Sequence, residues 1–224
     1  MPQTIPVDSK TQIAYVFIRD RILSGEFPQG MPLSERKLSQ MMEGISRTPI
    51  RAALSELCRN ELATTTPTSG IIVSIITQQD IHEIYDIRLM LDAHALKLFI
   101  NIATEQDLGQ VRLLHEDLEA AIRSGDAEAM LTADRLFHRF YVARCGNNRL
   151  HHLINMNIDQ YVRFRHFVVN ARQTVSEEEI MAGHTGVVKG ILKRDADMAT
   201  AALADSYNRL KALHLTLLAA SEAM

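Results

Sequence analysis

Apolar residues in the first third of the chain recur with the spacing of helices. They predict a helix over 11–23, which Gly25 ends, and a second, short helix over 34–42 that opens on a serine N-cap. A third helix is expected over 48–60, because Pro49 in a first turn costs no hydrogen bond. The segments between the helices contain glycine or proline, which favour turns. Three short helices in close succession therefore open the chain.

After the third helix the pattern changes to that of strands. Residues 64–66 are threonines, and residues 71–76 are mostly β-branched. Pro67 and Gly70 lie between these segments and favour a turn. The pattern predicts two short strands joined by a turn, which is a wing. Three helices and a wing in about 65 residues are the plan of a winged helix-turn-helix domain, in which one helix contacts base edges in the major groove.

From Thr77 onward the chain has the pattern of helices alone, and capping residues mark six of them. The expected helices are 77–102, 104–124, 126–145, 149–172, one that opens at Ser176, and one over 195–221. Such lengths suit an antiparallel bundle of about 145 residues with its own core. We therefore expect a mainly α chain. It has a flexible tail over 1–9, a winged helix-turn-helix domain over 10–76, and an all-helical effector-binding and dimerisation domain over 77–222.

Composition is that of a globular, mainly helical protein. Hydrophobic residues make up 46% and charged residues 23%, and a low aromatic content without Trp favours helices over sheets. No apolar run approaches the roughly 18 residues of a membrane span, and the N-terminus lacks a signal-peptide core. Cys58 and Cys145 are too few and too far apart for a disulfide framework. We expect a reduced, cytoplasmic setting.

The net charge of −3 does not by itself indicate a nucleic-acid partner. Residues 1–75 carry eight Lys and Arg against seven Asp and Glu, and residues 76–224 carry 16 against 20. A DNA-binding surface must therefore be a local concentration of basic residues. Five of them fall within 24 residues: Arg36, Lys37, Arg47, Arg51 and Arg59. On charge alone these residues fit a solvated face better than a binding surface.

Three stretches of sequence make the winged helix more specific. They read Ile-Leu-Ser-Gly-Glu-Phe-Pro-Gln-Gly at 22–30, Leu-Ser-Glu-Arg-Lys-Leu at 33–38 and Ser-Arg-Thr-Pro-Ile-Arg-Ala-Ala-Leu at 46–54. Together with the turn at Ser69-Gly70 they resemble the GntR family of bacterial regulators, nearly continuously over residues 11–75. The residues that this resemblance implies at the DNA are Arg36, Arg47, Thr48 and Arg51, with Gly70 at the tip of the wing.

The physical chemistry of these positions agrees with that assignment. Arg47 and Thr48 open the recognition helix, where backbone N–H groups and the helix dipole favour a phosphate. Arg51 lies one turn further along, points the same way and can donate two bonds to O6 and N7 of guanine. The start of this helix is therefore the expected DNA-reading surface.

An alternative and a departure accompany the resemblance. The alternative is that the arginines pair with Glu35, Glu56 and Glu61, and that Gly70 is only a turn glycine. The departure is that Glu61-Leu62 stands where the family usually has a glycine after the recognition helix. We expect this departure to leave DNA binding unaffected.

In the helical part the prominent residues are Asp134 and His138. Because they are four apart on one helix, they point the same way and can chelate one ion. Such a pair alone is typical of a surface ion pair. The stretches 84–92, 146–147 and 184–195, taken with this pair, resemble the FadR-type C-terminal domain found behind many GntR winged helices.

This second resemblance implies a metal and a carboxylate ligand in the bundle core. In the metal-binding members an Asp and three His hold a divalent ion, with zinc or nickel expected, and this chain supplies Asp134, His138 and His184. The fourth ligand falls at Ser206, and His214 lies two turns further along. Either water or the effector completes the coordination of the ion, or the ion is absent.

Two arginines are candidates for holding the effector. Arg88 is expected to face the bundle cavity, where a guanidinium can clamp a carboxylate, and Arg163 is a similar candidate. The alternative for Arg88 is an inter-helix salt bridge with Asp92 or Asp134.

We therefore expect a sequence-specific DNA-binding transcription regulator, a repressor rather than an activator. It would bind a palindromic operator as a homodimer and respond to a small carboxylate. The alternatives are a metal-dependent enzyme and a helical interaction module without a ligand, each fused to a DNA-binding domain. Against an enzyme, the sequence has no separate Glu-x-x-His base motif and no nucleophile elbow. We expect no enzymatic activity and no membrane association.

Overall fold

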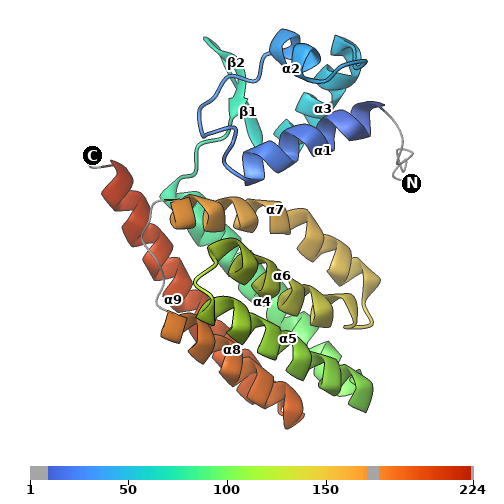
Figure 1. Ribbon diagram of the computed structural model, residues 1–224, viewed down its shortest axis with the longest axis vertical. Helices are drawn as coiled ribbons and strands as arrows, with labels where there is room; N and C mark the ends of the chain where they lie inside the picture. The colour runs from blue at the N-terminus through green and yellow to red at the C-terminus, as the bar shows by residue number, and fades with distance from the viewer. Residues whose placement is uncertain (1–9, 171–176, 223–224) are drawn as a thin grey trace. The chain divides into compact units, whose positions relative to one another are not determined.

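The computed structural model describes residues 10–170 and 177–222. Over these residues the chain is mainly helical with one two-stranded antiparallel sheet, so the predicted fold class is confirmed (Figure 1). The chain divides into two compact units. The first unit is Met1–Thr77 together with Asp159–Phe167, and the second is Gln78–Ile158 together with Val168–Met224. The expected tail over 1–9 lies outside the described residues.

The first unit has the element order of a winged helix-turn-helix. Its elements are α1 (Lys10–Leu23), α2 (Glu35–Met41), α3 (Arg47–Arg59), β1 (Ala63–Thr66) and β2 (Gly70–Val73). Both α1 and α2 pack on α3, and the apolar faces of the three helices meet in one core that includes Ile18, Leu38 and Leu54. The strands pair from Ala63 opposite Val73 to Thr66 opposite Gly70.

The predicted second strand extended to Ile76, but β2 ends at Val73. Since β1 is only four residues long, its pairing partners are used up at Val73. The backbone N–H of Ser74 instead donates to the carbonyl of Leu62, and Ile75 is exposed. The wing is therefore shorter than the β-branched run.

The end of α3 has the backbone conformation in which a glycine is favoured. Asn60 is the C-cap, and Glu61 follows it in the left-handed region with φ of 59°. The N–H of Leu62 donates to the carbonyl of Leu57 and that of Glu61 to the carbonyl of Cys58, which is the paired bonding of a Schellman motif. A glycine adopts this conformation without steric cost, whereas glutamate does not. Glu61 therefore holds a strained turn.

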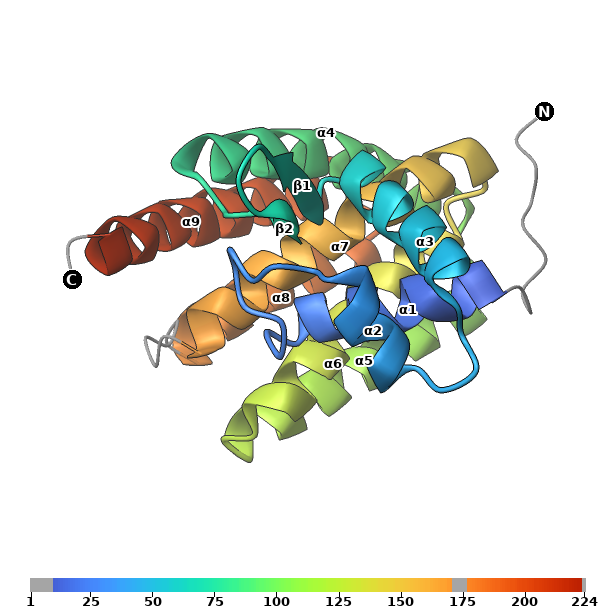
Figure 2. The ribbon, with the colours of Figure 1, turned by 90° about the horizontal axis from the view of Figure 1, so that it is seen from above.

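The second unit is a bundle of long helices. Its elements are α4 (Gln78–Ile102), α5 (Glu105–Arg123), α6 (Ala127–Ala143), α7 (Asn148–Asn170), α8 (Glu177–Leu192) and α9 (Ala196–Glu222). In the bundle α9 packs on α4 and α8, and α5 packs on α6 and α8 (Figure 1). Figure 2 shows α4 and α9 side by side from a second direction. Among the described residues, no helix is long and apolar enough to cross a membrane.

Local capping fixes where two of these helices begin. Thr104 and Asp107 form a reciprocal capping box at the start of α5, and the Asp126 carboxylate accepts bonds from the N–H groups of Glu128 and Ala129 at the start of α6. Both caps are the ones expected from the sequence. The expected cap at Ser176 lies outside the described residues.

The contact between α8 and α9 is close because α8 presents glycines to it. A Cβ atom on Gly183 would lie 2.5 Å from Ser206 Oγ, and one on Gly190 would lie 2.5 Å from the backbone nitrogen of Ala199. Larger residues at these positions of α8 would push the helices apart. This close approach sets the position of His184, which directly follows Gly183.

Candidate functional site

The residues expected at the DNA lie exposed in the first unit. Arg36 is on α2, and Arg47, Thr48 and Arg51 occupy the first two turns of α3, whose opposite face is buried in the core. Gly70 is exposed and begins β2 with φ of 69°. Its carbonyl accepts a bond from the Thr66 hydroxyl across the turn, so it fulfils the turn role that was the alternative. A glycine in this turn can also contact DNA at the tip of the wing.

Arg51 forms an ion pair with one of the three acids considered as alternatives. Its Nε donates to Glu35 Oε1 at 2.7 Å and its Nη2 to Oε2 at 3.0 Å. The guanidinium beside it holds the pKa of the Glu35 carboxyl below its usual range. The side chain of Arg51 is nevertheless 72% exposed. An exposed pair of this kind contributes little to stability, so it does not remove Arg51 from the candidate surface.

In the second unit three predicted metal ligands lie together. Asp134 and His138 come from α6 and His184 from α8, and one candidate ligand atom from each lies within 4.8 Å of the others. Asp134 Oδ1 is 3.0 Å from Nε2 of His184 and 3.8 Å from Nε2 of His138. Asp134 and His184 are buried. One carboxylate and two imidazoles at such distances are a suitable donor set for a divalent transition metal.

Burial keeps His138 in the form that can coordinate a metal. Because the ring is taken out of water, the pKa of His138 is lowered to about 4, with His184 and Arg88 adding to the decrease and Asp134 opposing it. The imidazole is therefore neutral near pH 7. Its Nδ1 is 2.8 Å from the hydroxyl of Tyr141, and this bond orients Nε2 toward Asp134.

Arg88 forms a salt bridge with Asp92, which was the alternative to a clamp for a carboxylate. Its Nη2 donates to Asp92 Oδ2 at 2.9 Å and to the hydroxyl of Tyr207 at 2.7 Å, and that hydroxyl donates to the same carboxylate. Both Arg88 and Asp92 are on α4, so the ion pair lies within one helix rather than between two. The Tyr207 ring lies 6.1 Å from the His138 ring. This buried network therefore adjoins the Asp134 group.

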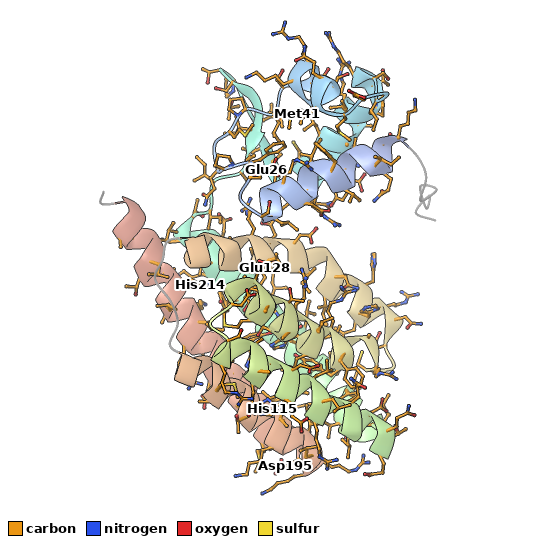
Figure 3. The ribbon with its side chains drawn as sticks, in the orientation of Figure 1. Glu26, Met41, His115, Glu128, Asp195 and His214 are labelled. Atoms are coloured by element: carbon orange, nitrogen blue, oxygen red, sulfur yellow. The ribbon has the colours of Figure 1, made fainter. Side chains whose placement is uncertain are left out.

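The position of the missing fourth ligand is occupied by a small residue packed on α8. Ser206 faces Gly183, the residue before His184. His214, two turns further along α9 (Figure 3), is buried, and its Nδ1 lies 3.0 Å from the hydroxyl of Tyr85. It is not a member of the group formed by Asp134, His138 and His184. The donor set offered by the described residues is therefore those three.

Arg163 contacts the backbone of the first unit. It lies in the segment of α7 that groups with the first unit, and its Nη1 is 3.4 Å from the carbonyl oxygen of Ser74.

Three tyrosines of the site were not singled out from the sequence. Tyr85, Tyr141 and Tyr207 are all nearly inaccessible, and each hydroxyl contacts an ionisable side chain that is buried or, for His138, partly buried. A buried tyrosine needs a partner for its hydroxyl. The five tyrosines of this chain, which has no Trp, were therefore the feature of the sequence that could have indicated such contacts. Which of them reach the site depends on how α4, α6 and α9 pack.

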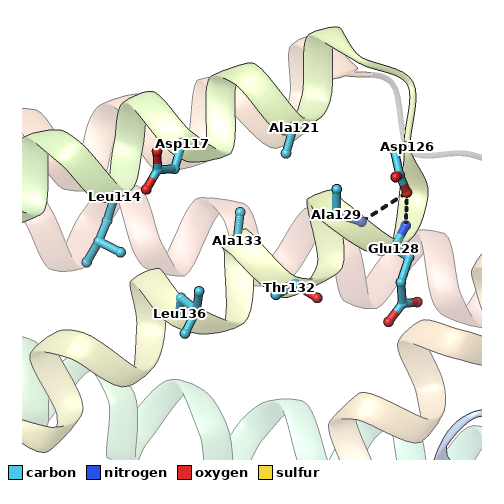
Figure 4. A pocket seen from close by; sticks show the side chains of 9 residues that line it. All are labelled: Leu114, Asp117, Ala121, Asp126, Glu128, Ala129, Thr132, Ala133 and Leu136. Atoms are coloured by element: carbon cyan, nitrogen blue, oxygen red, sulfur yellow. Dashed lines mark hydrogen bonds between the residues drawn. The ribbon is translucent and has the colours of Figure 1, made fainter.

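A separate groove runs between α5 and α6 (Figure 4). Leu114, Ala121 and Leu136 line it, and Asp126 lies at one end with its carboxylate bonded to the first turn of α6. None of Asp134, His138 and His184 lines this groove, although two of them share α6 with it. The helix α6 thus presents different residues to two places in the bundle.

Comparison with known proteins places both units. Residues 10–73 match the bacterial regulatory proteins of the gntR family, and residues 83–209 match the FCD domain. The chain belongs to the GntR family of bacterial regulators. The FCD domain is the FadR-type C-terminal domain expected from the sequence, so that resemblance is confirmed.

Relatives and solved structures agree with this family. The chain is 26% identical over 83% of its length, and 82% of the other chain, to the uncharacterised HTH-type transcriptional regulator YdhC of Bacillus subtilis. It is 26% identical, over 85% and 79%, to the gluconate operon transcriptional repressor of Bacillus licheniformis. Its fold matches that of Escherichia coli McbR/YncC with a TM-score of 0.76, at 22% identity over 93% and 98% of the two chains.

The comparisons also decide between the functional classes. The chain is a DNA-binding transcription regulator, because its family and its relatives are regulators and several of them are named repressors. The expectation that it is not an enzyme is confirmed, since the relatives and fold neighbours are regulators rather than enzymes.

Proposed function

We propose that this GntR-family protein is a repressor that binds a palindromic operator as a homodimer in the cytoplasm, and that a small carboxylate effector modulates this binding. The effector would bind in the FCD domain beside a divalent ion, zinc or nickel, held by Asp134, His138 and His184. The observation that supports the ion most strongly is the cluster of these three side chains, in which Asp134 and His184 are buried, His138 is partly buried, and His138 is held neutral.

On the DNA side, we propose that Arg36, Arg47, Thr48 and Arg51 contact the operator, with Gly70 at the wing. Their exposure on α2 and on the start of α3 supports this proposal, because that end of a recognition helix enters the major groove. Backbone N–H groups at the start of α3 add attraction for a phosphate. Each arginine that makes a bidentate contact with a base would contribute roughly 1–3 kcal/mol to the free energy of operator binding.

On the effector side, charge favours binding through the ion. The positive charge of Arg88 is offset by Asp92, and its Nη2 is bonded to both Asp92 and Tyr207. A carboxylate therefore needs another source of positive charge, which a divalent ion would supply. Three protein ligands also leave a coordination position for an exogenous oxygen. Arg88 would then contribute to the electric field at the effector and to its orientation more than it would clamp the effector directly, and Arg163 stays a candidate for contacting it.

The proposed link between the units rests on chain connectivity. Only residues 74–77 separate the last residue of the wing strand from α4, the helix that carries Arg88. A ligand that favours one packing of the bundle over another could bias the wing through so short a connection. Its leverage on DNA affinity is limited to its differential affinity for the two packings, typically about 1–3 kcal/mol.

Metal analysis of the full-length protein tests the ion. After loading with Zn²⁺ or Ni²⁺ and dialysis, the parent protein should retain about one ion per chain, whereas His138→Ala and His184→Ala should retain none. His152→Ala is the matched control, because His152 is an exposed histidine of α7 and its loss should leave the stoichiometry unchanged. Equal retention by the parent and the two site variants would refute the metal site.

Thermal denaturation with a panel of small carboxylates tests the effector. A carboxylate that binds the folded protein should raise the melting temperature of the ion-loaded parent and leave His138→Ala unchanged. The same compound should change the affinity of the parent for its operator but not that of the variant. If no carboxylate stabilises the loaded parent, the FCD domain is better described as a helical interaction module.

A further inference from the structure

The ion pair between Glu35 and Arg51 joins the two helices of the helix-turn-helix. Glu35 is the first residue of α2 and directly follows its N-cap, Ser34, while Arg51 is on α3. The two bonds, from Nε and Nη2 of the arginine, use the side edge of the guanidinium and both carboxylate oxygens. The pair therefore fixes the plane of an otherwise exposed and flexible side chain.

This geometry leaves the tip of the guanidinium available. Arginine has five N–H groups, and Glu35 takes one on Nε and one on Nη2. Of the three others, one on Nη1 and one on Nη2 lie parallel at the end of the side chain. Such a pair of donors matches the O6 and N7 acceptors that guanine presents in the major groove.

We propose that Glu35 is a specificity-determining residue, which holds Arg51 with its end pair of donors outward so that it reads a guanine rather than a phosphate. This inference rests on the proposed sequence-specific DNA binding. The role of Glu35 is that of a positioning residue, because it acts through Arg51.

The charge of Glu35 contributes to the same preference. The exposed Arg36 and Lys37 follow Glu35 on α2, and Arg47 of α3 is close enough to act on the ionisation of Glu35. A fixed negative charge there repels phosphates, so it disfavours any placement in which Arg51 rests on the DNA backbone. Binding to unrelated sequences, which is almost wholly electrostatic, is thereby weakened more than binding to the operator.

A matched pair of charge-neutralising variants tests this proposal. Glu35→Gln removes one carboxylate from an exposed arginine–glutamate pair. Glu26→Gln, at the residue labelled in Figure 3, does the same to the pair of Glu26 with Arg21 in the same unit. The full-length parent is first used to select preferred sites from a random duplex library. Affinities for a selected duplex, its single-base variants and a scrambled duplex are then measured at several salt concentrations.

Glu35→Gln should bind the scrambled duplex several-fold more tightly, with a salt dependence steeper by about one ion. Its discrimination at one guanine position should fall about tenfold, and Arg51→Ala should lose discrimination at that same position. Glu35→Asp should restore the weak binding to scrambled duplex but not the discrimination, because its carboxylate does not reach as far. Glu26→Gln should discriminate like the parent.

The outcomes separate two failures. If the parent selects no preferred sequence, the proposed sequence-specific function fails and this inference fails with it. If the parent selects a site but Glu35→Gln discriminates at every position as the parent does, only the role of Glu35 is overturned. Loss of discrimination at a position that Arg51→Ala leaves unaffected would also overturn it, because Glu35 would then act without Arg51.

Discussion

Glu61 illustrates at the scale of one residue what sequence and structure each provide. The departure from the family's glycine is visible in the sequence, but only the backbone shows that Glu61 adopts a left-handed conformation. Replacing it with glycine should relieve the steric cost of about 1–2 kcal/mol, while the added freedom of the unfolded chain takes back about half of that. We expect Glu61→Gly to stabilise the protein by about 0.5–1 kcal/mol in urea unfolding.

The neighbouring residue is the control for that prediction. Asn60 has φ of −92°, so Asn60→Gly relieves no strain and should not stabilise the protein. If Glu61→Gly is no more stable than the parent, the turn after α3 is not strained. DNA affinity should be the same for both variants, in line with the expectation that this departure leaves binding unaffected.

A second single-residue prediction concerns the contact of α8 with α9. The added methyl of Gly183→Ala would lie 2.5 Å from Ser206 Oγ, so one of the helices must shift at a cost of roughly 1–3 kcal/mol. Gly109→Ala is the control, because nothing lies within 4 Å of its added methyl in α5. That change should instead stabilise the protein by up to about 1 kcal/mol. Equal melting temperatures for the two variants would contradict the close packing.

The candidate site shows the same division between local and long-range information. Asp134 and His138 could be paired from their spacing alone, and the family resemblance added His184. The contact of Tyr207 with Arg88 could not be predicted, because it joins α9 to α4 across more than one hundred residues. The spacing of apolar residues predicts which face of a helix is buried, but it does not predict which other helix packs on that face.

At the scale of elements, the start of α5 provides a stability prediction that depends on pH. Both the backbone N–H and the hydroxyl of Thr104 donate to the Asp107 carboxylate, and these bonds lower the pKa of Asp107. A carboxyl with a lowered folded-state pKa stabilises the fold above its ordinary pKa, and this contribution is lost as pH falls through the folded value. Removing the charge should therefore matter at neutral pH and not in acid.

We expect Asp107→Asn to destabilise the protein by about 1 kcal/mol at pH 7, a typical value for a helix cap. The difference from the parent should shrink below about pH 4. Urea unfolding of both proteins across this range measures it, with Asp117→Asn as the control, an exposed acid further along the same helix. A destabilisation that stays constant down to pH 3 would show that the charge of Asp107 is not the cause.

Most of the elements could be predicted because their ends carry local signals. Ser34, Thr104 and Asp126 each cap the helix that the sequence assigns to them. The second wing strand was predicted too long, because β-branched residues indicate a strand whether or not a partner is available. The length of β1 decided where pairing ends, and no property of residues 74–76 themselves indicated it.

At the scale of the whole molecule, two compact units follow the change of pattern near Thr77, but one grouping was not foreseen. Residues Asp159–Phe167 of α7 group with the first unit, and Gln160 donates to the backbone carbonyl of Asn60. The regular spacing of apolar residues along α7 does not indicate this grouping, because it does not show which part of the chain a buried polar side chain contacts. The sequence therefore predicts the order of the two units better than it predicts which residues belong to each.

The homodimer is the prediction that belongs to the whole molecule. One winged helix offers few contacts to DNA, and two related by a twofold axis would read both halves of a palindrome. We expect sedimentation velocity to give a dimer at micromolar concentration, and a selected palindromic duplex to bind two chains. Scrambling one half-site should weaken binding much more than scrambling the sequence outside both halves, because it removes one recognition helix from its bases. A monomer with and without DNA, bound equally well to one half-site, would contradict the dimer and leave the DNA-reading surface of α3 to act alone.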